Sequence, residues 1–187
     1  MLPVLIVALA VALAAEGCGG TTIRVDRGDR PAAGALPDSA VEAMRLDRAS
    51  AQHLGTFHGR GVWLAPTADG ETCLLDTAAD AVGAACGAPL FGTHQLAFTE
   101  ATEGGPPPRP LTLVRITGVA KRGVRSVVVE LSDGSSAPLV ANAQGAFVYE
   151  EPAEQLSAGV RPTALIARNG AAGRIDSVDL PRAPFSS

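Results

Sequence analysis

Three cysteines are the residues in this sequence whose types and spacing most readily do chemistry: Cys18, Cys73 and Cys86. Cys73 and Cys86 would close a loop of about 14 residues, and a disulfide there would stabilise an exported chain by about 3 kcal/mol. A zinc site would need two further ligands, and a redox pair would have the C-x-x-C spacing, which this pair does not have. We therefore predict a Cys73–Cys86 disulfide, which leaves Cys18 to be explained.

The segment before Cys18 is typical of a secretory leader. Residues 1–15 are wholly apolar or small, and the run ends at Glu16. The run is shorter than the roughly 20 residues that a membrane-spanning helix needs, and its length fits the apolar region of a signal peptide. The basic residues that usually begin such a peptide are missing. The leader predicts an exported protein.

Cys18 stands in the sequence Ala15-Glu16-Gly17-Cys18-Gly19-Gly20. This hexapeptide resembles the lipobox of bacterial lipoproteins: the first glycine and the cysteine match the pattern, whereas the alanine and the glutamate depart from it. The resemblance implies a signal peptide over residues 1–17, a diacylated Cys18 as the mature N-terminus, and a position on the outer face of the cell membrane. A competing cleavage site, Ala12-Leu13-Ala14, would release a secreted protein instead.

The histidines form no recognisable catalytic or metal-binding pattern. His53 and His58 are five residues apart, so they would not share a helix face as a metal-binding pair does. The sequence has no phosphate-binding loop, nucleophile elbow, zinc-protease motif or EF-hand loop. We expect no catalytic centre, no metal and no cofactor. A histidine within hydrogen-bond reach of a carboxylate that lines a deep pocket would instead favour an enzyme.

The carboxylates are expected to be structural. Asp69, Asp76 and Asp80 bracket the first predicted hairpin, where aspartates commonly form turns and only rarely hold calcium. Glu150 and Glu151 are adjacent, and neighbours in a strand point to opposite faces. They are therefore a poor pair for acid–base catalysis.

Two loops carry basic residues that could bind an anionic ligand. Arg109 lies in the Pro-rich segment Gly104–Pro110. The second basic cluster surrounds a predicted turn and comprises Arg115, Lys121, Arg122 and Arg125. A solvated turn is the simpler interpretation of this cluster, and contact with an acidic envelope polymer is the functional one. We name Arg109, Lys121 and Arg122 as the candidate ligand-binding residues.

Composition limits the partners. The 187 residues include 19 acidic and 15 basic side chains, for a net charge of −4, and 47% are apolar. This balance argues against nucleic acid and anionic membrane surfaces as main partners. The expected partners are a membrane, through a lipid anchor at Cys18, and an envelope polymer or protein.

The chain length fits one domain with tails. Residues 18–37 are rich in glycine, proline and charges of alternating sign, which predicts a flexible, lipid-anchored tether. Residues 38–182 would form a single β-rich domain and residues 183–187 a C-terminal tail. A short helix is expected to open the domain, with Ser39-Ala40-Val41-Glu42 as a capping box and Gly55 as its stop.

From residue 61 onward, short apolar runs alternate with turn signals. The predicted strands are Gly61–Ala65, Thr72–Leu75, Ala84–Cys86, His94–Thr99, Leu111–Thr117, Val124–Leu131, Ser136–Val140, Ala146–Glu150, Thr163–Arg168 and Arg174–Leu180. Strands at this spacing, separated by turns such as Asp69-Gly70, predict a mainly β fold, an antiparallel sandwich or barrel. Such a fold presents its loops at its ends, where ligands are usually bound.

A second, weaker resemblance covers residues 61 to 150. The residues that carry it are Trp63-Leu64-Ala65-Pro66, Asp69-Gly70-Glu71-Thr72-Cys73-Leu74-Leu75, Gly83-Ala84-Ala85-Cys86, Gly118-Val119, Val124–Leu131, Asp133-Gly134, Asn142 and Phe147. The pattern is similar to uncharacterised exported β-domain proteins of high-GC Gram-positive bacteria. This resemblance implies an exported β domain and no particular activity.

Together these observations predict a non-catalytic, lipid-anchored β domain that acts as a binding or structural module of the cell envelope. Two alternatives stay open: an envelope sensor or regulatory protein, and an enzyme with an unrecognised active site. A membrane-spanning helix would favour the first alternative, and convergent titratable groups in a pocket would favour the second.

Overall fold

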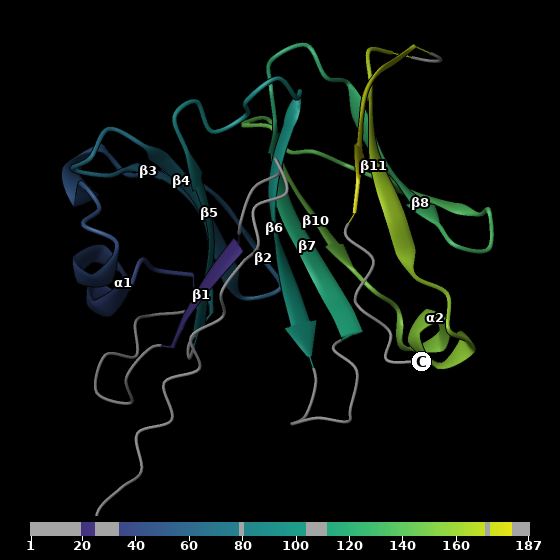
Figure 1. Ribbon diagram of the computed structural model, residues 1–187, viewed down its shortest axis with the longest axis horizontal. Coiled ribbons are helices and arrows are strands. Elements are labelled where there is room, and N and C mark those ends of the chain that lie inside the picture. The colour runs from purple at the N-terminus through teal and green to yellow at the C-terminus, as the bar shows by residue number, and fades with distance from the viewer. Residues whose placement is uncertain (1–19, 25–33, 79–80, 104–111, 171–172, 181–187) are drawn as a thin grey trace, which may run out of the picture.

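The computed structural model describes residues 20–24, 34–78, 81–103, 112–170 and 173–180. In these residues the fold is mainly β, as the sequence predicts, with short helices at two points (Figure 1). The elements are β1 (Gly20–Arg24), α1 (Asp38–Ala43), a 3-10 turn (Arg48–Ser50), β2 (Gln52–Phe57), β3 (Arg60–Pro66), β4 (Thr72–Thr77), β5 (Ala81–Gly87), β6 (Leu96–Glu103), β7 (Thr112–Ala120), β8 (Ser126–Leu131), β9 (Ser136–Leu139), β10 (Ala146–Glu150), α2 (Ala153–Ala158), β11 (Pro162–Arg168) and β12 (Arg174–Asp179).

The strands form three open antiparallel sheets. The first has the order β1-β5-β4-β3-β2, the second β10-β7-β6, and the third β12-β11-β8-β9. We call them the N-terminal, middle and C-terminal sheets. The chain leaves the middle sheet after β7, forms the β8–β9 hairpin, returns as β10, and then completes the C-terminal sheet with β11 and β12.

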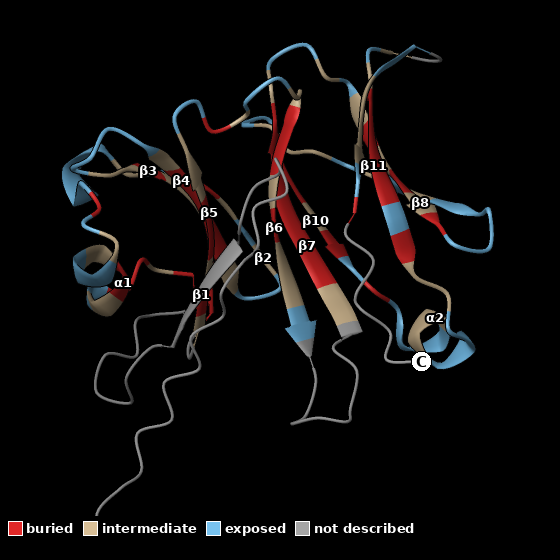
Figure 2. Ribbon diagram, in the orientation of Figure 1, coloured by how far each residue is buried: buried red, intermediate tan, exposed pale blue. Residues whose placement is uncertain are grey.

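The middle sheet lies between the other two, so both of its faces are covered (Figures 1 and 2). Successive residues of a strand point to opposite faces, and the two apolar clusters divide accordingly. In β6, Leu96 belongs to the cluster shared with the C-terminal sheet and Ala97 to the cluster shared with the N-terminal sheet. In β10, Phe147 and Ala146 divide in the same way.

The outer face of the N-terminal sheet is covered by the segment that contains α1. Leu36, Ala40 and Leu46 pack there against strand residues that include Leu75 and Cys73. Cys73 is bonded to Cys86 with an S–S distance of 2.03 Å and a Cα–Cα distance of 4.0 Å, which confirms the predicted disulfide. The two cysteines are directly opposite in the β4–β5 register, so the bond joins neighbouring strands of one sheet.

The N-terminal part of the fold corrects several sequence predictions. Part of the segment predicted as a flexible tether is a strand, because Gly20–Arg24 pairs with β5 in antiparallel register. The predicted capping box at Ser39 is not formed. The N-cap residue of α1 is Pro37, which makes no side-chain cap hydrogen bond, and Ser39 lies inside the helix. The helix ends at Ala43, and Gly55 belongs to β2 rather than to a helix stop.

The strands predicted from residue 61 onward are all present, with ends that differ by a few residues. The short helix α2 was not predicted. It begins after Pro152, whose fixed φ suits a helix start, and ends at Gly159, which has φ +74°. The predicted tail at residues 183–187 lies outside the described residues.

Candidate functional site

A group of charged side chains is buried between the N-terminal and middle sheets, where an antiparallel core is normally apolar. Alternation explains which strand positions contribute. In β4, Asp76 shares a face with Leu74, and in β7, Arg115 shares a face with Thr117 and Val119. Leu74 and Val119 are part of the apolar cluster at one end of this interface. Two residues further along each strand, the same faces become polar.

Asp76 is the centre of this group and is only 2% exposed. Its Oδ1 accepts a hydrogen bond from Arg60 Nε at 2.9 Å. Its Oδ2 accepts from Arg115 Nε at 3.0 Å and from Thr117 Oγ1 at 2.9 Å. A buried carboxylate is tolerated only when it is paired and hydrogen-bonded, and here two cations and one hydroxyl meet that requirement.

Arg115 links this carboxylate to a second one. It is 4% exposed, and its Nη1 donates to Glu150 on β10. Burial lowers the pKa of Arg115, the charge of Asp76 opposes this effect, and the neighbouring charge of Arg60 adds to it. Its third nitrogen, Nη2, is buried and has no hydrogen-bond partner among the described residues.

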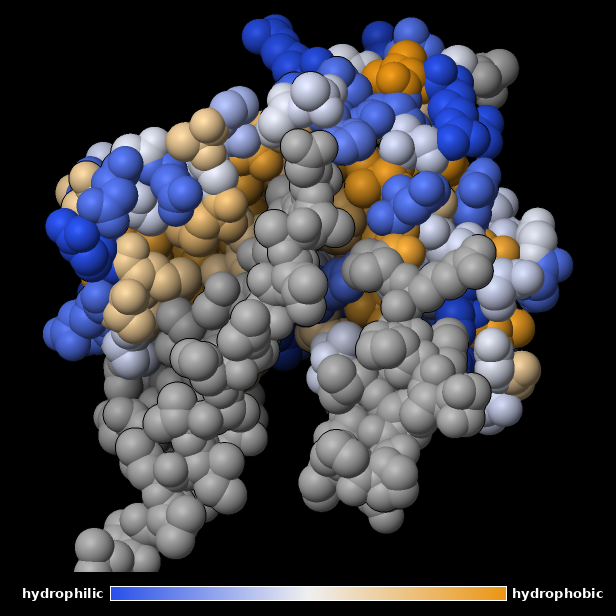
Figure 3. Space-filling model, in the orientation of Figure 1, coloured by the Kyte–Doolittle hydropathy of each residue, from blue (hydrophilic) through white to orange (hydrophobic). Residues whose placement is uncertain are grey.

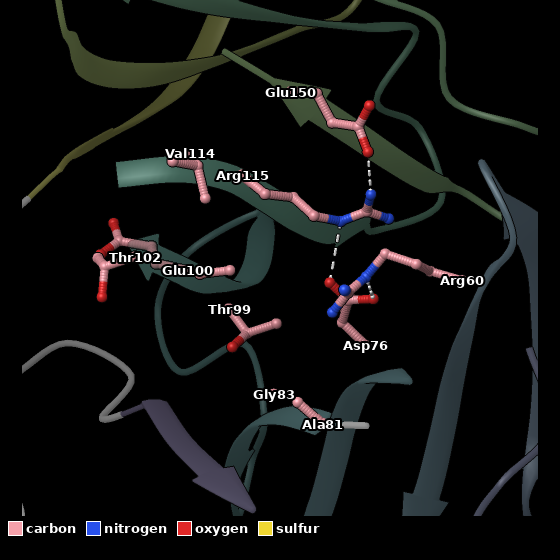
Figure 4. A pocket seen from close by; sticks show the side chains of 11 residues that line it. Arg60, Asp76, Ala81, Gly83, Thr99, Glu100, Thr102, Val114, Arg115 and Glu150 are labelled. Carbon is pink, nitrogen blue, oxygen red and sulfur yellow. Dashed lines mark hydrogen bonds and ion pairs between the residues drawn. The ribbon is translucent and has the colours of Figure 1, made fainter. Parts of the chain in front are cut away.

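A cavity of about 460 Å³ opens beside these groups (Figure 4). It is lined by Arg60, Asp76, Ala81, Gly83, Thr99, Glu100, Ala101, Thr102, Val114, Arg115 and Glu150. In Figure 4 the guanidinium groups meet Asp76 on one side of the cavity, and Glu100 extends away from them. Cavities of roughly 300–1,000 Å³ are usual for small-molecule sites.

Two polar atoms on this face of the middle sheet are buried and have no hydrogen-bond partner in the described part of the chain: Arg115 Nη2 and Thr99 Oγ1. A third such atom, Glu100 Oε1, belongs to the residue after Thr99, which is opposite Ile116 and therefore points to the other face of the middle sheet. Each such atom costs roughly 1–3 kcal/mol when nothing satisfies it. Native proteins contain only a few of them, so two on one wall of a cavity are a signal that a ligand is bound there. The arrangement is suited to a ligand that supplies the missing hydrogen bonds.

Glu100 is a titrating group at the edge of the site, and its position opposite Ile116 directs its side chain to the other face of the middle sheet. Burial raises the pKa of its carboxyl from an ordinary value of 4.5 to about 7. A carboxyl with this pKa is protonated in part near neutral pH, so it can donate as well as accept a hydrogen bond. The same pKa is suited to proton transfer.

His58 meets the geometric criterion that favours an enzyme. It lies in the turn between β2 and β3, with φ +49°, and its Nδ1 is 2.7 Å from Glu150 Oε2. Glu150 also lines the cavity and binds Arg115. A series of side-chain contacts, His58 to Glu150 to Arg115 to Asp76, therefore connects an exposed hairpin turn to the buried carboxylate.

The other histidines lie elsewhere. His53 stacks against Trp63 with ring centroids 4.5 Å apart, and its Nε2 is 3.3 Å from Thr56 Oγ1. His94 Nδ1 is 3.2 Å from Asp176 Oδ1, and neither residue lines the cavity. Burial raises the pKa of Asp176, but hydrogen bonds from Gln95 and His94 outweigh this effect and lower it overall.

The predicted ligand-binding residues are not at this cavity. Lys121 and Arg122 follow β7, at the opposite end of the middle sheet from Arg115. The sequence analysis grouped Arg115 with Lys121, Arg122 and Arg125, and this grouping is wrong. Arg115 is a buried residue of β7. Arg109 and Cys18 lie outside the described residues.

Sequence reasoning missed Arg60, Thr99 and Glu100 and assigned Asp76 to a turn, although it ends up buried in β4. One signal was available. Asp76 follows the buried run Cys73-Leu74-Leu75, and Arg115 stands in the apolar strand that continues to Ile116. A charge on the buried face of a predicted strand indicates either a partner in the core or a site.

Comparisons with known proteins add no assignment: no protein-family model, no curated protein and no solved structure matches this chain. The described residues contain no group of three or more potential metal ligands. None of the helices in the described ranges is long and apolar enough to cross a membrane.

Proposed function

We propose that this chain is an exported, lipid-anchored β domain that binds a small, neutral, oxygen-rich ligand in the cavity between its N-terminal and middle sheets. The observation that carries the proposal is the pair of buried, unpartnered polar atoms at one cavity, Arg115 Nη2 and Thr99 Oγ1. Such atoms lower stability in the free protein, and a ligand that pairs with them recovers that loss as binding free energy.

The donors around the cavity define the complementary ligand. Arg115 Nη2 has only N–H groups to offer, and the Thr99 hydroxyl can donate. The ligand must therefore present acceptor oxygens, such as the carbonyl and hydroxyl groups of a saccharide or the carbonyl groups of a short peptide.

Charge balance favours a neutral ligand over an anion. The two guanidinium groups of Arg60 and Arg115 are already matched by the carboxylates of Asp76 and Glu150. A ligand carboxylate would add an uncompensated charge to a buried site. A neutral saccharide avoids this cost.

A screen by solution NMR tests this proposal. N-acetylglucosamine serves as the neutral probe and succinate as the charged probe. We expect the sugar to shift the backbone resonances of residues 81–83 and 99–102, and Thr99→Val to weaken its binding about tenfold. Thr163→Val is the matched control, because this exposed threonine on β11 undergoes the same chemical change far from the cavity. Binding of succinate alone, or sugar binding that Thr99→Val leaves unchanged, would overturn the proposal.

The lipid anchor is tested separately. The position of Cys18 after the leader supports acylation, although Cys18 lies outside the described residues. We expect the mass spectrum of the mature protein to show a diacylated cysteine at its N-terminus, and Cys18→Ala to release the protein from the membrane fraction. A mature N-terminus at Ala15 would show instead that the protein is secreted.

A second candidate function is catalysis by proton transfer at the same cavity. The pKa of about 7 for Glu100 and the contact between His58 and Glu150 favour it. The binding proposal is preferred because the buried carboxylate of Asp76 is held by Arg60, Arg115 and Thr117, and is therefore not free to accept a proton from a substrate. An enzyme would lose turnover, but not sugar affinity, in Glu100→Gln. A binding module would show no turnover in either form.

A further inference from the structure

Five basic residues gather at one end of the C-terminal sheet. They are Lys121, Arg122, Arg125, Arg168 and Arg174. The pairing of the strands places them together: Arg168 is opposite both Ser126 at the start of β8 and Arg174 at the start of β12. The backbone N–H of Arg125 donates to the carbonyl of Arg168 at 2.7 Å. We call this set the basic end.

The charges of the basic end are not neutralised by the described residues. None of its members takes part in an ion pair there, whereas other arginines of the described chain do. Arg122, Arg125 and Arg174 are exposed. Arg168 Nε is buried without a partner in the described residues. The nearby carboxylate of Asp176 is already occupied by His94 and by the backbone N–H of Gln95.

Apart from Asp176, the described acidic residues in and next to the C-terminal sheet lie at its other end. They are Glu130, Asp133, Glu151, Glu154 and Asp179. The register shows the separation, because Asp179 is opposite Ala164, near the start of β11, whereas Arg174 is opposite the last residue of that strand. The net charge of −4 therefore conceals a strongly uneven distribution. A separated patch of one sign attracts a partner of the opposite sign even when the whole protein is acidic.

Two exposed aliphatic side chains accompany the basic end. Val140 is 88% exposed and Ile175 is 40% exposed, and they are the large hydrophobic residues that stand out to solvent in the described chain. Val140 follows the last residue of β9, which pairs with Val127, and Ile175 follows Arg174. Figure 3 shows hydrophobic atoms among strongly hydrophilic ones at this upper end of the molecule.

We infer that the basic end docks on the surface of a membrane that contains anionic phospholipids. Arginine binds phosphate oxygens in a forked geometry, which suits lipid headgroups. Exposed aliphatic side chains beside such cations can enter the boundary between headgroups and acyl chains. A soluble polyanion would use the arginines but would gain nothing from Val140 and Ile175. The pairing of both features therefore favours a membrane.

The position of the N-terminal strand is consistent with this orientation, a point that rests on the proposed acylation of Cys18. Gly20, two residues after Cys18, is opposite Ala85, and β5 then continues to Gly87 and the loop that leads into β6. That loop meets the basic end, because the N–H of Lys121 donates to the carbonyl of Gln95. A lipid at Cys18 would hold this end of the domain toward the bilayer.

Vesicle partitioning tests the inference independently of acylation and of the cavity. Every variant carries Cys18→Ser in the full chain. Arg122→Gln with Arg125→Gln is compared with Arg45→Gln and Arg48→Gln, which remove the same charge at the other side of the molecule, where Arg45 pairs with Asp69. The vesicles contain phosphatidylcholine alone, which measures binding through the leader, or phosphatidylcholine with 30% phosphatidylglycerol.

We expect the basic-end pair to lower partitioning into the anionic vesicles about 25-fold, since each basic residue near such a surface contributes roughly fivefold. The control pair should change it less than threefold. Val140→Ser with Ile175→Ser should lower it severalfold at unchanged charge. An equal loss for both arginine pairs would overturn the inference. So would binding to soluble polyglycerol phosphate as tight as binding to vesicles, together with no effect of the Val140 and Ile175 substitutions.

Discussion

The two faces of the middle sheet differ in composition. One face consists of the apolar residues that packing requires, and the other also carries charged residues that packing does not require. One face meets the C-terminal sheet through a continuous apolar cluster that includes Phe147, Ile116 and Leu165. The other face begins in the same way, with Ala146 and Val119, but ends at a cavity lined by charged groups.

A sheet covers each face of the middle sheet, so residues on both faces are buried. The difference is that the second face buries an ion pair beside a cavity, where Arg115 Nη2 and Thr99 Oγ1 have no hydrogen-bond partner among the described residues. Apolar residues at these positions would be expected to give a more stable fold, and this cost is what the proposed ligand site would explain.

The largest effect is expected on the polar face from Arg115→Ala. It would leave Asp76 buried with Arg60 as its remaining cation, and breaking a buried pair in this way costs about 3–5 kcal/mol. The free energy of unfolding in urea measures the loss. The double variant Arg115→Met with Asp76→Asn should recover a large part of it. A cost below about 1 kcal/mol for Arg115→Ala would show that the ion pair is not buried as described.

On the apolar face, Phe147→Ala should cost about 3–5 kcal/mol through the cavity that it creates. Phe147 is fully buried and packs on Gly118, where an added Cβ would lie 2.1 Å from the Phe147 ring. Gly118→Ala should therefore also destabilise the fold. Thermal unfolding measures both changes. Folded Phe147→Ala protein should retain sugar affinity, and a loss of affinity equal to that of Thr99→Val would remove the contrast between the two faces.

The disulfide stabilises the sheet that forms one wall of the cavity. Cys73→Ala with Cys86→Ala should lower the free energy of unfolding by about 3 kcal/mol, since the bond closes a loop with a sequence separation of 13. Denaturant titration of the double variant measures this. Membrane attachment should not change, because the proposed anchor is Cys18. Release of the double variant from the membrane fraction would contradict that separation of roles.

Glu100 makes stability depend on pH. Its pKa is about 7 in the folded protein against an ordinary 4.5, so the folded state binds the proton more tightly. The resulting stability is fully present below about pH 4.5 and is lost as the pH rises through 7. The difference amounts to about 3 kcal/mol between these limits. Urea unfolding at pH 5 and pH 8 should show this fall in the wild type and a smaller fall in Glu100→Gln. Equal falls in both would exclude Glu100 as its source.

Much of the fold could be predicted from the sequence because its strands carry strong local signals. Val127, Val128 and Val129 indicate β8, and Asp69-Gly70 marks the turn between β3 and β4. β1 and β2 carry no such signal. Glycines interrupt β2, and β1 is defined by pairing with β5, about 60 residues away in the sequence.

The cavity could not be predicted from the sequence, for a different reason. Asp76, Thr99 and Arg115 meet only because a second sheet packs on the first, and no local pattern specifies which faces will meet. The sequence placed Thr99 and Arg115 in strands and Asp76 at a turn. The apolar neighbours of Asp76 and Arg115 indicate burial, but they do not indicate that the two residues lie opposite one another. The disulfide was predictable because chemistry, rather than packing, pairs two cysteines.

The smallest effect is also the most direct test of the central claim, that the cavity is a ligand site. Thr99→Val removes one unpartnered hydroxyl and keeps the shape of the side chain. Urea unfolding of the variant and the wild type, each with and without N-acetylglucosamine, gives the answer. We predict that the variant is more stable by about 1 kcal/mol without the sugar, and that the sugar stabilises the wild type more than the variant. A variant that is less stable than the wild type, and equally stabilised by the sugar, would contradict the account.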